Sequence, residues 1–365
     1  MILLYALSIA LHLYIGARLV PDLAPGGAAA ALAALLVVSA LSVPLGLIAR
    51  RFARPPFADK LAWLGLLCMG LFSSLLVLTF VRDLALLAVH APAFRAASAQ
   101  AVPVLGLLLT AVGLANARRT PPVKQVRVPI ANLPVALHGF RIVQISDVHV
   151  GPTIKQGYIE QVVERVNSLR PDVVAVTGDL VDGAVPELAP HVAPLARLAS
   201  IHGTFFVTGN HEYYSGVEPW LAEVRRLGMR VLMNEHVVIE HGGAQLVLAG
   251  VPDYGGAAFD AEHSSDPKRA AHGAPAAAPK VLLAHQPRSA RAAADAGFDL
   301  QLSGHTHGGQ FFPWNFFVPL QQPFTAGLHR LGELWIYVSR GTGYWGPPKR
   351  VGAPSEITEL VLQSM

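Results

Sequence analysis

The sequence predicts an N-terminal α-helical membrane region followed by an α/β domain in which two β-sheets form a sandwich flanked by helices. Hydrophobic residues make up 52% of the 365 residues and charged residues only 14%, and the apolar excess lies before residue 120. Beyond residue 120, helix-like and strand-like segments alternate, a pattern typical of helices covering a sheet. A chain of this length has room for about two domains.

The membrane region is predicted from stretches that lack Asp, Glu, Lys and Arg and are long enough to cross a bilayer. They cover residues 27–49, 61–81 and 96–117, and residues 1–17 are a shorter fourth candidate. A signal peptide is the alternative for residues 1–17, although no basic residue precedes the apolar run. A buried core helix is the alternative for residues 96–117, whose Pro103 and small residues also suit packing in lipid.

Orientation follows from the basic residues that flank the apolar stretches. With four crossings, two basic clusters share one side; they are Arg50, Arg51, Arg54 and Lys60, and Arg118, Arg119, Lys124 and Arg127. Because basic loops stay in the cytoplasm, we expect a multi-pass protein of the cell (inner) membrane whose domain beyond residue 136 lies in the cytoplasm. An odd number of helices would reverse this orientation.

Charge and cysteine content narrow the expected partners. The formal net charge is +4, and much of the excess lies beside the apolar stretches, which favours contact with the anionic headgroups of a lipid bilayer. No basic stripe interleaved with aromatic residues is present, so no nucleic-acid partner is expected. The single cysteine, Cys68, can form no internal disulfide, and the sequence leaves the oligomeric state open.

Prolines mark the expected domain boundary. Pro121, Pro122 and Pro129 end the helical pattern, so we expect a transmembrane region over 1–120, a linker with an edge strand over 121–136, and the α/β domain over 137–365. Residues 140–150 should form a buried strand and residues 156–169 a helix. The segment from 255 to 278 is rich in Ala, Gly and Pro and is expected to be a mobile loop or a short helix.

Five short hydrophobic runs in the second part each end in Asp, Asn or His. The residues that follow these runs are Asp147 and His149, then Asp179, then Asn210 and His211, then His285, and finally His305 and His307. Two imidazoles one residue apart between glycines are typical of half a metal site. The alternatives are helix caps for Asp147 and Asp179 and a turn residue for Asn210.

The five blocks, in this order, resemble the calcineurin-like metallophosphoesterase superfamily. Two further blocks, His285-Gln286-Pro287 and Gly308-Gly309-Gln310, resemble its bacterial YkuE/YaeI-like branch. The resemblance implies a four-layer sandwich with two mixed β-sheets and two divalent metal ions. It also implies that Asp179 bridges the metals, with Asp147, His149 and His307 on the first, and Asn210, His285 and His305 on the second.

The same resemblance implies a metal-dependent phosphoric ester hydrolase of phosphodiesterase or pyrophosphatase type. Two neighbouring metals would supply a hydroxide that attacks phosphorus in line, and a mixed O and N ligand set favours Mn, Fe or Zn. His211 is expected to steady the phosphoryl group or protonate the leaving oxygen, and Glu212 is expected to orient the His211 ring. A purely structural role is the alternative for His211.

Two other functions remain as alternatives. One is a non-catalytic or regulatory metal-binding module, and the other is a transporter or sensor with a regulatory phosphoesterase domain. The apolar stretches carry no Asp, Glu, Lys or Arg, and such residues usually mark a transport path. The sequence therefore favours the hydrolase.

The aromatic segment 311–320 directly follows the paired histidines. It is either an irregular core segment or an apolar lip that meets acyl chains or the bilayer surface. Together with a membrane anchor, a lip favours a lipid-linked phosphoester or pyrophosphate. UDP-2,3-diacylglucosamine is one candidate, because similar proteins in this branch hydrolyse it. Arg288 and Arg350 are interpreted as solvated charges, with contact to a phosphate as the alternative.

Overall fold

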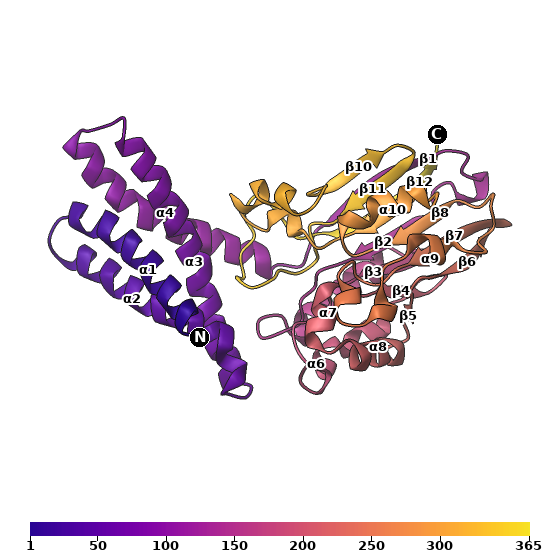
Figure 1. Ribbon diagram of the computed structural model, residues 1–365, viewed down its shortest axis with the longest axis horizontal. Coiled ribbons are helices and arrows are strands. Elements are labelled where there is room, and N and C mark those ends of the chain that lie inside the picture. The colour runs from indigo at the N-terminus through magenta and orange to yellow at the C-terminus, as the bar shows by residue number, and fades with distance from the viewer. The chain divides into compact units, whose positions relative to one another are not determined.

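The computed structural model describes all 365 residues, which form two compact units (Figure 1). The first unit contains Met1–Arg118 together with Gly346–Val351. The second unit contains Arg119–Trp345 and Gly352–Met365.

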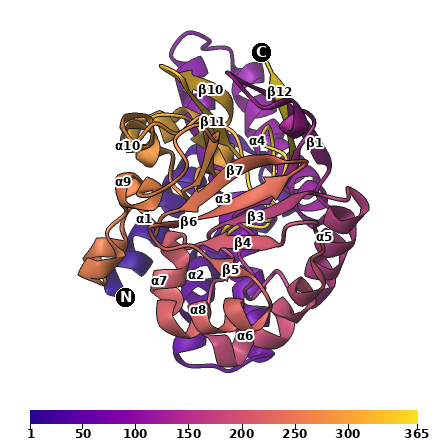
Figure 2. The same cartoon turned by 90° about the vertical axis from the view of Figure 1, so that its right-hand side faces the viewer.

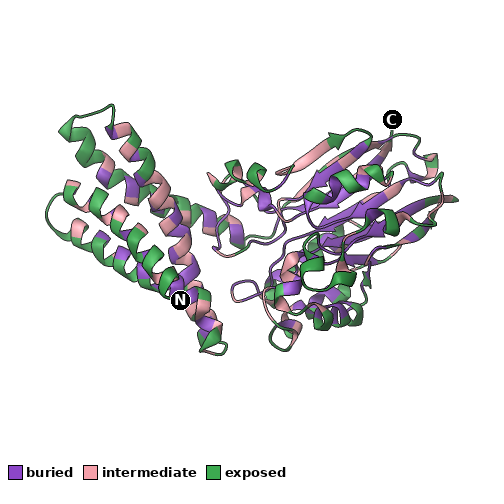
Figure 3. Cartoon of the chain, viewed as in Figure 1, coloured by how far each residue is buried: buried purple, intermediate pink, exposed green.

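Four long helices make up most of the first unit: α1 (Ile2–Leu19), α2 (Gly27–Ile48), α3 (Phe57–Leu86) and α4 (Pro92–Arg118). All four are long and apolar enough to cross a membrane, which confirms the expectation of four candidate membrane helices. Long stretches of these helices are exposed, drawn green in Figure 3, and many of the exposed residues are apolar; Leu13 is 66% exposed. Lipid acyl chains can cover such surfaces, whereas water cannot do so favourably.

Small and polar residues hold these helices together. Gly46 of α2 and Gly65 of α3 bring the two backbones into contact, and a Cβ at Gly65 would collide with both Gly46 and the Ser42 carbonyl. Close backbone approach of this kind is a main source of helix association in lipid. Between α1 and α2, the buried His12 places Nε2 2.9 Å from Ser39 Oγ.

A short segment from late in the sequence, Gly346–Val351, belongs to this helical unit. The Lys349 ammonium donates hydrogen bonds to the Gly70 carbonyl oxygen (2.8 Å) and to the Thr110 hydroxyl (3.3 Å). The Arg350 backbone N–H donates to the Gly113 carbonyl oxygen at 2.9 Å. Arg350 is only 1% exposed, so its interpretation as a solvated charge is wrong.

The second unit contains two six-stranded sheets. In the first sheet the strand order is β1-β12-β2-β3-β4-β5. Strands β2 to β5 are parallel neighbours, whereas β12 is antiparallel to β2 and parallel to β1. The strands of this sheet are β1 (Val123–Ile130), β2 (Arg141–Ile145), β3 (Val173–Thr177), β4 (Thr204–Val207), β5 (Arg230–Val231) and β12 (Ile357–Ser364).

The second sheet has the order β10-β11-β9-β8-β7-β6. Its four central strands are parallel, and the edge strands β6 and β10 are antiparallel to their neighbours. Both sheets are therefore mixed, as expected. The strands of this sheet are β6 (Glu235–His241), β7 (Ala244–Gly250), β8 (Lys280–Leu283), β9 (Leu300–Ser303), β10 (Gly327–Leu331) and β11 (Leu334–Val338).

The two sheets share a buried apolar core. Val173 and Phe205 of the first sheet lie in one cluster with Leu248 and Leu302 of the second. On the far side of the second sheet, Ala290 belongs to a cluster with β7, β8 and β11. Figure 2 shows α9 (Pro267–Ala271) and α10 (Ala290–Asp295) on one side of the sandwich and α5 (Gln156–Ser168), α6 (Val185–Val192) and α8 (Val217–Arg226) on the other. The four-layer architecture is confirmed.

Some element boundaries differ from the sequence expectation. Strand β2 ends at Ile145 rather than continuing to residue 150, because Asp147 and His149 adopt positive φ angles of 53° and 55° that a strand does not permit. Helix α7 (Asn210–Ser215) was not predicted, since six residues are too few to show helical periodicity. The Ala- and Gly-rich segment 255–278 contains short helices, α9 among them.

Candidate metal centre

The predicted ligands lie just beyond the carboxyl ends of parallel strands. Asp147 and His149 follow β2, Asp179 follows β3, and Asn210 follows β4 at the start of α7. From the second sheet, His285 follows β8, and His305 and His307 follow β9. Strands β2 to β4 are parallel neighbours in one sheet, as β8 and β9 are in the other. Parallel strands end at the same edge of a sheet, which brings these side chains together.

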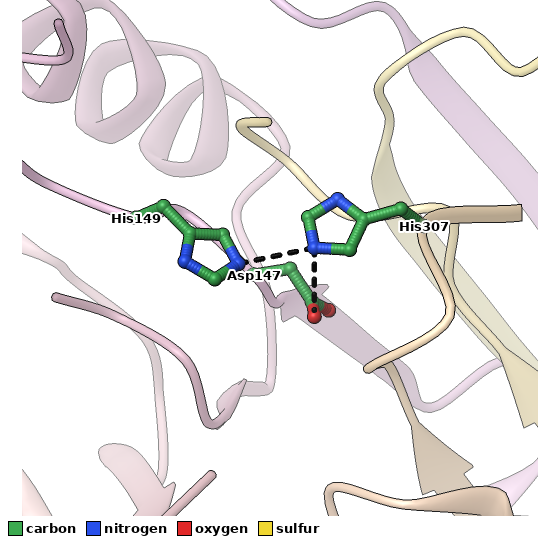
Figure 4. Close-up of side chains that lie close together, drawn as sticks. All are labelled: Asp147, His149 and His307. Atoms are coloured by element: carbon green, nitrogen blue, oxygen red, sulfur yellow. Dashed lines mark hydrogen bonds and ion pairs between the residues drawn. The ribbon is translucent and has the colours of Figure 1, made fainter. Parts of the chain in front are cut away.

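Asp147, His149 and His307 form a first group whose ligand atoms all lie within 4.8 Å of one another. The Nε2 atoms of His149 and His307 are 3.0 Å apart, and His307 Nε2 is 3.4 Å from Asp147 Oδ1 (Figure 4). All three side chains are buried. Two ring nitrogens and a carboxylate oxygen that converge on one point form a cation-binding arrangement.

Asp179, His285 and His305 form a second group of the same compactness. Asp179 Oδ2 lies 3.2 Å from His285 Nε2, and His285 Nε2 lies 3.3 Å from His305 Nδ1. The same Asp179 oxygen is 3.9 Å from His149 Nε2 of the first group. A carboxylate within reach of both groups has the position that a bridging ligand requires.

Two buried oxygen atoms without a hydrogen-bond partner indicate that this site fits a metal. Asp147 Oδ2 and Asn210 Oδ1 are both buried and have no hydrogen-bond partner in the protein. A buried polar atom without a partner is costly, and two bound cations, one near Asp147 and one near Asn210, would satisfy these oxygens. Asn210 directly precedes His211, whose backbone N–H donates to Asp179 Oδ1 at 2.9 Å. The available donors are oxygens and imidazole nitrogens, a set that suits Mn, Fe or Zn.

The backbone at this site is strained. Five candidate ligands adopt the left-handed region; their φ angles are 53° for Asp147, 55° for His149, 51° for Asp179, 70° for His305 and 51° for His307. This region costs a non-glycine residue about 1–3 kcal/mol and persists where surrounding structure enforces it. The concentration of such residues at one sheet edge indicates a functional constraint on the loops.

Two glycines provide the space that the carboxylates occupy. A Cβ at Gly209 would collide with the Asp179 carboxylate, and a Cβ at Gly304 would collide with the Asp147 carboxylate and Ser146 Oγ. Both loops therefore require glycine for close approach.

Asp182 is a site residue that the sequence reasoning missed. Its Oδ1 atom lies 2.8 Å from His149 Nδ1 and 2.7 Å from His211 Nδ1. Burial disfavours a charged His211 ring, but the contact with Asp182 and the charge of Asp179 outweigh it and raise the pKa of His211 to about 9. His211 is therefore placed and charged as a proton donor would be. The available signal was the spacing of Asp182, three residues after Asp179 on the same loop.

Glu212 does not orient His211, contrary to expectation. Its carboxylate accepts hydrogen bonds from the backbone N–H groups of Asp179 (3.0 Å), Leu180 (2.7 Å) and Gly209 (2.6 Å). Glu212 thus fixes the loop that carries Asp179, and Asp182 is the residue that contacts the His211 ring.

The electrostatics of the second group favour a negative Asp179. Burial acts against the charged carboxylate, but His285, His149 and His211 outweigh it and hold the pKa of Asp179 well below its usual range. Despite its burial, His285 has a pKa well above its usual value because Asp179 lies beside it. A buried carboxylate that stays ionised at neutral pH is suited to binding a cation.

A sandwich of two mixed sheets with His and Asp groups at its strand ends defines a protein of the metallophosphoesterase class. Residues 140–309 match the family described as calcineurin-like phosphoesterase. The chain is 38% identical over 329 residues to a transmembrane protein with metallophosphoesterase domain from Danio rerio, covering 82% of this chain and 74% of that protein. The chain belongs to the calcineurin-like metallophosphoesterase family.

Two other relatives are similar over shorter stretches. The transmembrane protein with metallophosphoesterase domain from Bos taurus is 43% identical over 268 residues, which are 70% of this chain and 60% of that protein. The metallophosphoesterase YkuE of Bacillus subtilis is 31% identical over 250 residues, covering 64% of this chain and 82% of YkuE. The match thus spans less than two thirds of the bovine relative's length.

Proposed function

We propose that this protein is a membrane-anchored phosphohydrolase that uses two divalent metal ions to cleave phosphodiester or pyrophosphate bonds. The observation that carries this proposal is the position of Asp179, within 4 Å of one histidine from each ligand group. The first metal would be held by Asp147, His149 and His307, and the second by Asn210, His285 and His305. Bound together, such metals supply a nucleophile at neutral pH and neutralise charge on the phosphoryl oxygens.

His211 is proposed as the catalytic residue. It is half-buried at the edge of the site, and its ring centroid lies 5.3 Å from that of Tyr214 and 5.8 Å from that of Trp345. In its protonated form His211 can donate a hydrogen bond to a phosphoryl oxygen or a proton to the leaving oxygen. Asp182 holds the ring in the orientation that this role requires.

Turnover and metal content test the function together. Detergent-purified protein with Mn²⁺ should hydrolyse bis-p-nitrophenyl phosphate, and Asp179→Ala should lose both metals and turnover. The proposal fails if the wild-type protein binds metal but hydrolyses no phosphoester with Mn²⁺, Fe²⁺ or Zn²⁺ across the pH range. That outcome would favour the non-catalytic metal-binding module instead.

For the substrate, we propose a lipid-linked phosphoester or pyrophosphate, of which UDP-2,3-diacylglucosamine is one example. Most of the aromatic segment beyond the paired histidines is exposed: Phe312 is 61%, Phe316 66% and Leu320 80% exposed, whereas Phe311 is buried. Exposed aromatic and aliphatic side chains on a membrane-anchored protein favour contact with acyl chains. Hydrolysis of substrate in vesicles, compared with a water-soluble analogue, tests this assignment.

We further propose that the protein lies in the cell (inner) membrane with its catalytic domain, residues 137–365, in the cytoplasm. The four candidate membrane helices support an even number of crossings. The basic cluster of Arg50, Arg51, Arg54 and Lys60 and the basic residues after α4 would then lie on the cytoplasmic side, in agreement with the usual distribution of Lys and Arg.

A further inference from the structure

A cavity of about 670 Å³ lies beside the loop that carries His285. Three segments of the second unit line it: the loop after β7, the β8–α10 connection with α10 itself, and the chain after residue 320. The side chains that matter for its chemistry are Tyr254, Arg288, Arg291, Asp295 and Phe324. None of them has a role in the metal centre.

Two arginines give this cavity a positive character. Arg288 and Arg291 are both exposed and neither forms an ion pair, although Asp295 lines the same cavity. Two guanidinium groups against one carboxylate leave a net positive charge. Unpaired arginines in a concave surface are suited to anions, because the planar guanidinium fork matches the oxygens of a phosphate or carboxylate.

Arg288 is held in position by its surroundings. Its Nε donates a hydrogen bond to the Gln321 carbonyl oxygen at 2.7 Å, and its guanidinium carbon lies 6.0 Å from the centre of the Tyr254 ring. Nε uses only one of the five N–H donors of the group. The remaining donors are available to a ligand, and less side-chain entropy is lost on binding because the arginine is already oriented.

A buried hydrogen-bond network joins the walls of this cavity to the metal-binding edge. The Gln286 side-chain amide donates to both carboxylate oxygens of Asp253 at 3.0 and 3.1 Å, and the Gln322 amide donates to Gln286 Oε1 at 3.1 Å. Gln286 directly follows His285, and each member of the network lies within two residues of a cavity-lining side chain. The network therefore fixes the cavity relative to the second ligand group.

The distance between Arg288 and the metal centre is short enough for one substrate molecule to reach both. Arg288 follows His285 by three residues, so their Cα atoms are at most about 11 Å apart. The long arginine side chain can bridge part of that distance. A group bound at Arg288 and a phosphoryl group at the metal centre can therefore belong to one ligand of nucleotide size.

We propose that Arg288 and Arg291 bind a second anionic group, a phosphate or a carboxylate, of the phosphoester whose scissile phosphoryl group lies at the metal centre. Tyr254 and Phe324 would contact the planar or apolar part of the substrate next to that group. This inference rests on the proposed hydrolase function and narrows its substrate class. Phosphoanhydrides and phosphodiesters that carry a second negative charge are preferred over simple diesters.

A matched pair of substrates tests the subsite in the full-length protein with Mn²⁺. The p-nitrophenyl ester of thymidine 5′-phosphate is compared with the same ester that also carries a 3′-phosphate. Arg288→Ala/Arg291→Ala should raise KM for the 3′-phosphorylated ester by about 10-fold or more, the scale expected for lost charge-assisted hydrogen bonds. KM for the other ester and kcat for both should change less than about twofold, within the effect of an ordinary surface substitution. Equal changes on the two esters would overturn the proposal.

Control variants distinguish loss of the two positive charges from nonspecific disruption of the structure. Arg165→Ala removes an exposed arginine from α5 and should change neither KM. Arg288→Lys/Arg291→Lys keeps both charges and should restore part of the preference for the 3′-phosphorylated ester. No recovery with lysine, combined with an altered thermal unfolding temperature, would assign the effect to structure and count against the subsite.

Binding measurements distinguish failure of the subsite from failure of the hydrolase proposal. If the wild-type protein hydrolyses neither ester, the proposed activity fails, but the subsite is still measurable by calorimetry. Thymidine 3′,5′-bisphosphate should bind more tightly than thymidine 5′-monophosphate to the wild-type protein and with equal affinity to Arg288→Ala/Arg291→Ala. Equal affinity in the wild-type protein would refute the subsite regardless of turnover.

Discussion

His211 Nδ1 lies 2.7 Å from Asp182 Oδ1, and the same carboxylate oxygen lies 2.8 Å from His149 Nδ1. One side chain thus orients a candidate metal ligand and the candidate catalytic histidine together. A metal-binding histidine commonly has its second ring nitrogen fixed by a carboxylate in this way, and loss of such a partner typically costs 10–100-fold in metal affinity or activity.

Asp182→Asn should change the pH dependence of catalysis. Burial opposes the charged ring, yet Asp182 and Asp179 raise the pKa of His211 to about 9, so His211 is protonated below that pH and loses its proton as pH rises through it. Removal of the Asp182 charge should move the alkaline limb of the kcat/KM profile to lower pH by about 1–3 units. An unchanged alkaline limb would show that another group controls it.

His211→Ala should separate catalysis from metal binding. Because His211 is not among the proposed ligands, bound metal measured by elemental analysis should equal that of the wild-type protein. Loss of a proton donor should reduce kcat by roughly 10²–10⁴. A wild-type kcat would assign His211 a structural role, and lost metal would place it among the ligands.

Gly304→Ala should disturb the first ligand group. The added methyl group would collide with the Asp147 carboxylate and Ser146 Oγ, so we expect a loss of bound metal and a destabilisation of about 1–3 kcal/mol from overpacking. Metal content and the thermal unfolding temperature in detergent measure both effects. Gly157→Ala is the matched control, because a Cβ there has no neighbour within 4 Å; full metal occupancy in Gly304→Ala would contradict the close approach.

Phe312→Ser/Trp314→Ser should lower activity on lipid substrates more than on water-soluble esters. Both side chains are exposed, Phe312 at 61% and Trp314 at 41%, so their loss should weaken contact with acyl chains without creating a core cavity. Rates on vesicle-borne and soluble substrates are compared with those of Ile201→Ser, which removes another exposed apolar side chain. An equal loss on both substrate types would eliminate the acyl-chain contact.

A reporter at the C-terminus should give a cytoplasmic signal. Four crossings place both basic clusters on one side of the membrane, and that side is normally cytoplasmic. A green fluorescent protein fused after Met365 should fluoresce, whereas alkaline phosphatase at the same point should stay inactive. The reverse pair of results would indicate an odd number of crossings.

The sequence predicted the candidate ligands because each follows a hydrophobic strand directly, and strand ends in a parallel sheet lie side by side. Asp182 could not be found in the same way, since its importance depends on two imidazoles that approach it from β2 and α7. Glu212 was given the wrong partner for a related reason: at the start of a short helix, its side chain turns back to backbone N–H groups instead of reaching the neighbouring ring.

The cavity beside His285 was equally hidden from the sequence. Arg288 and Arg291 are separated from Tyr254 by more than thirty residues and from Phe324 by about as many, and only the sheet order brings these segments together. Sequence spacing does not reveal that these segments lie close together, because their proximity depends on long-range packing.

The helical unit includes six residues, Gly346–Val351, that follow nearly all of the catalytic domain in the sequence. A fragment that begins after Arg118 would therefore carry Gly346–Val351 without α3 and α4. The Lys349 ammonium would lose its carbonyl partner on Gly70, and Pro347 and Val351 would face water in place of helix. A water-soluble form of this enzyme therefore requires changes in two regions: removal of the N-terminal helices and redesign of Gly346–Val351 near the C-terminus.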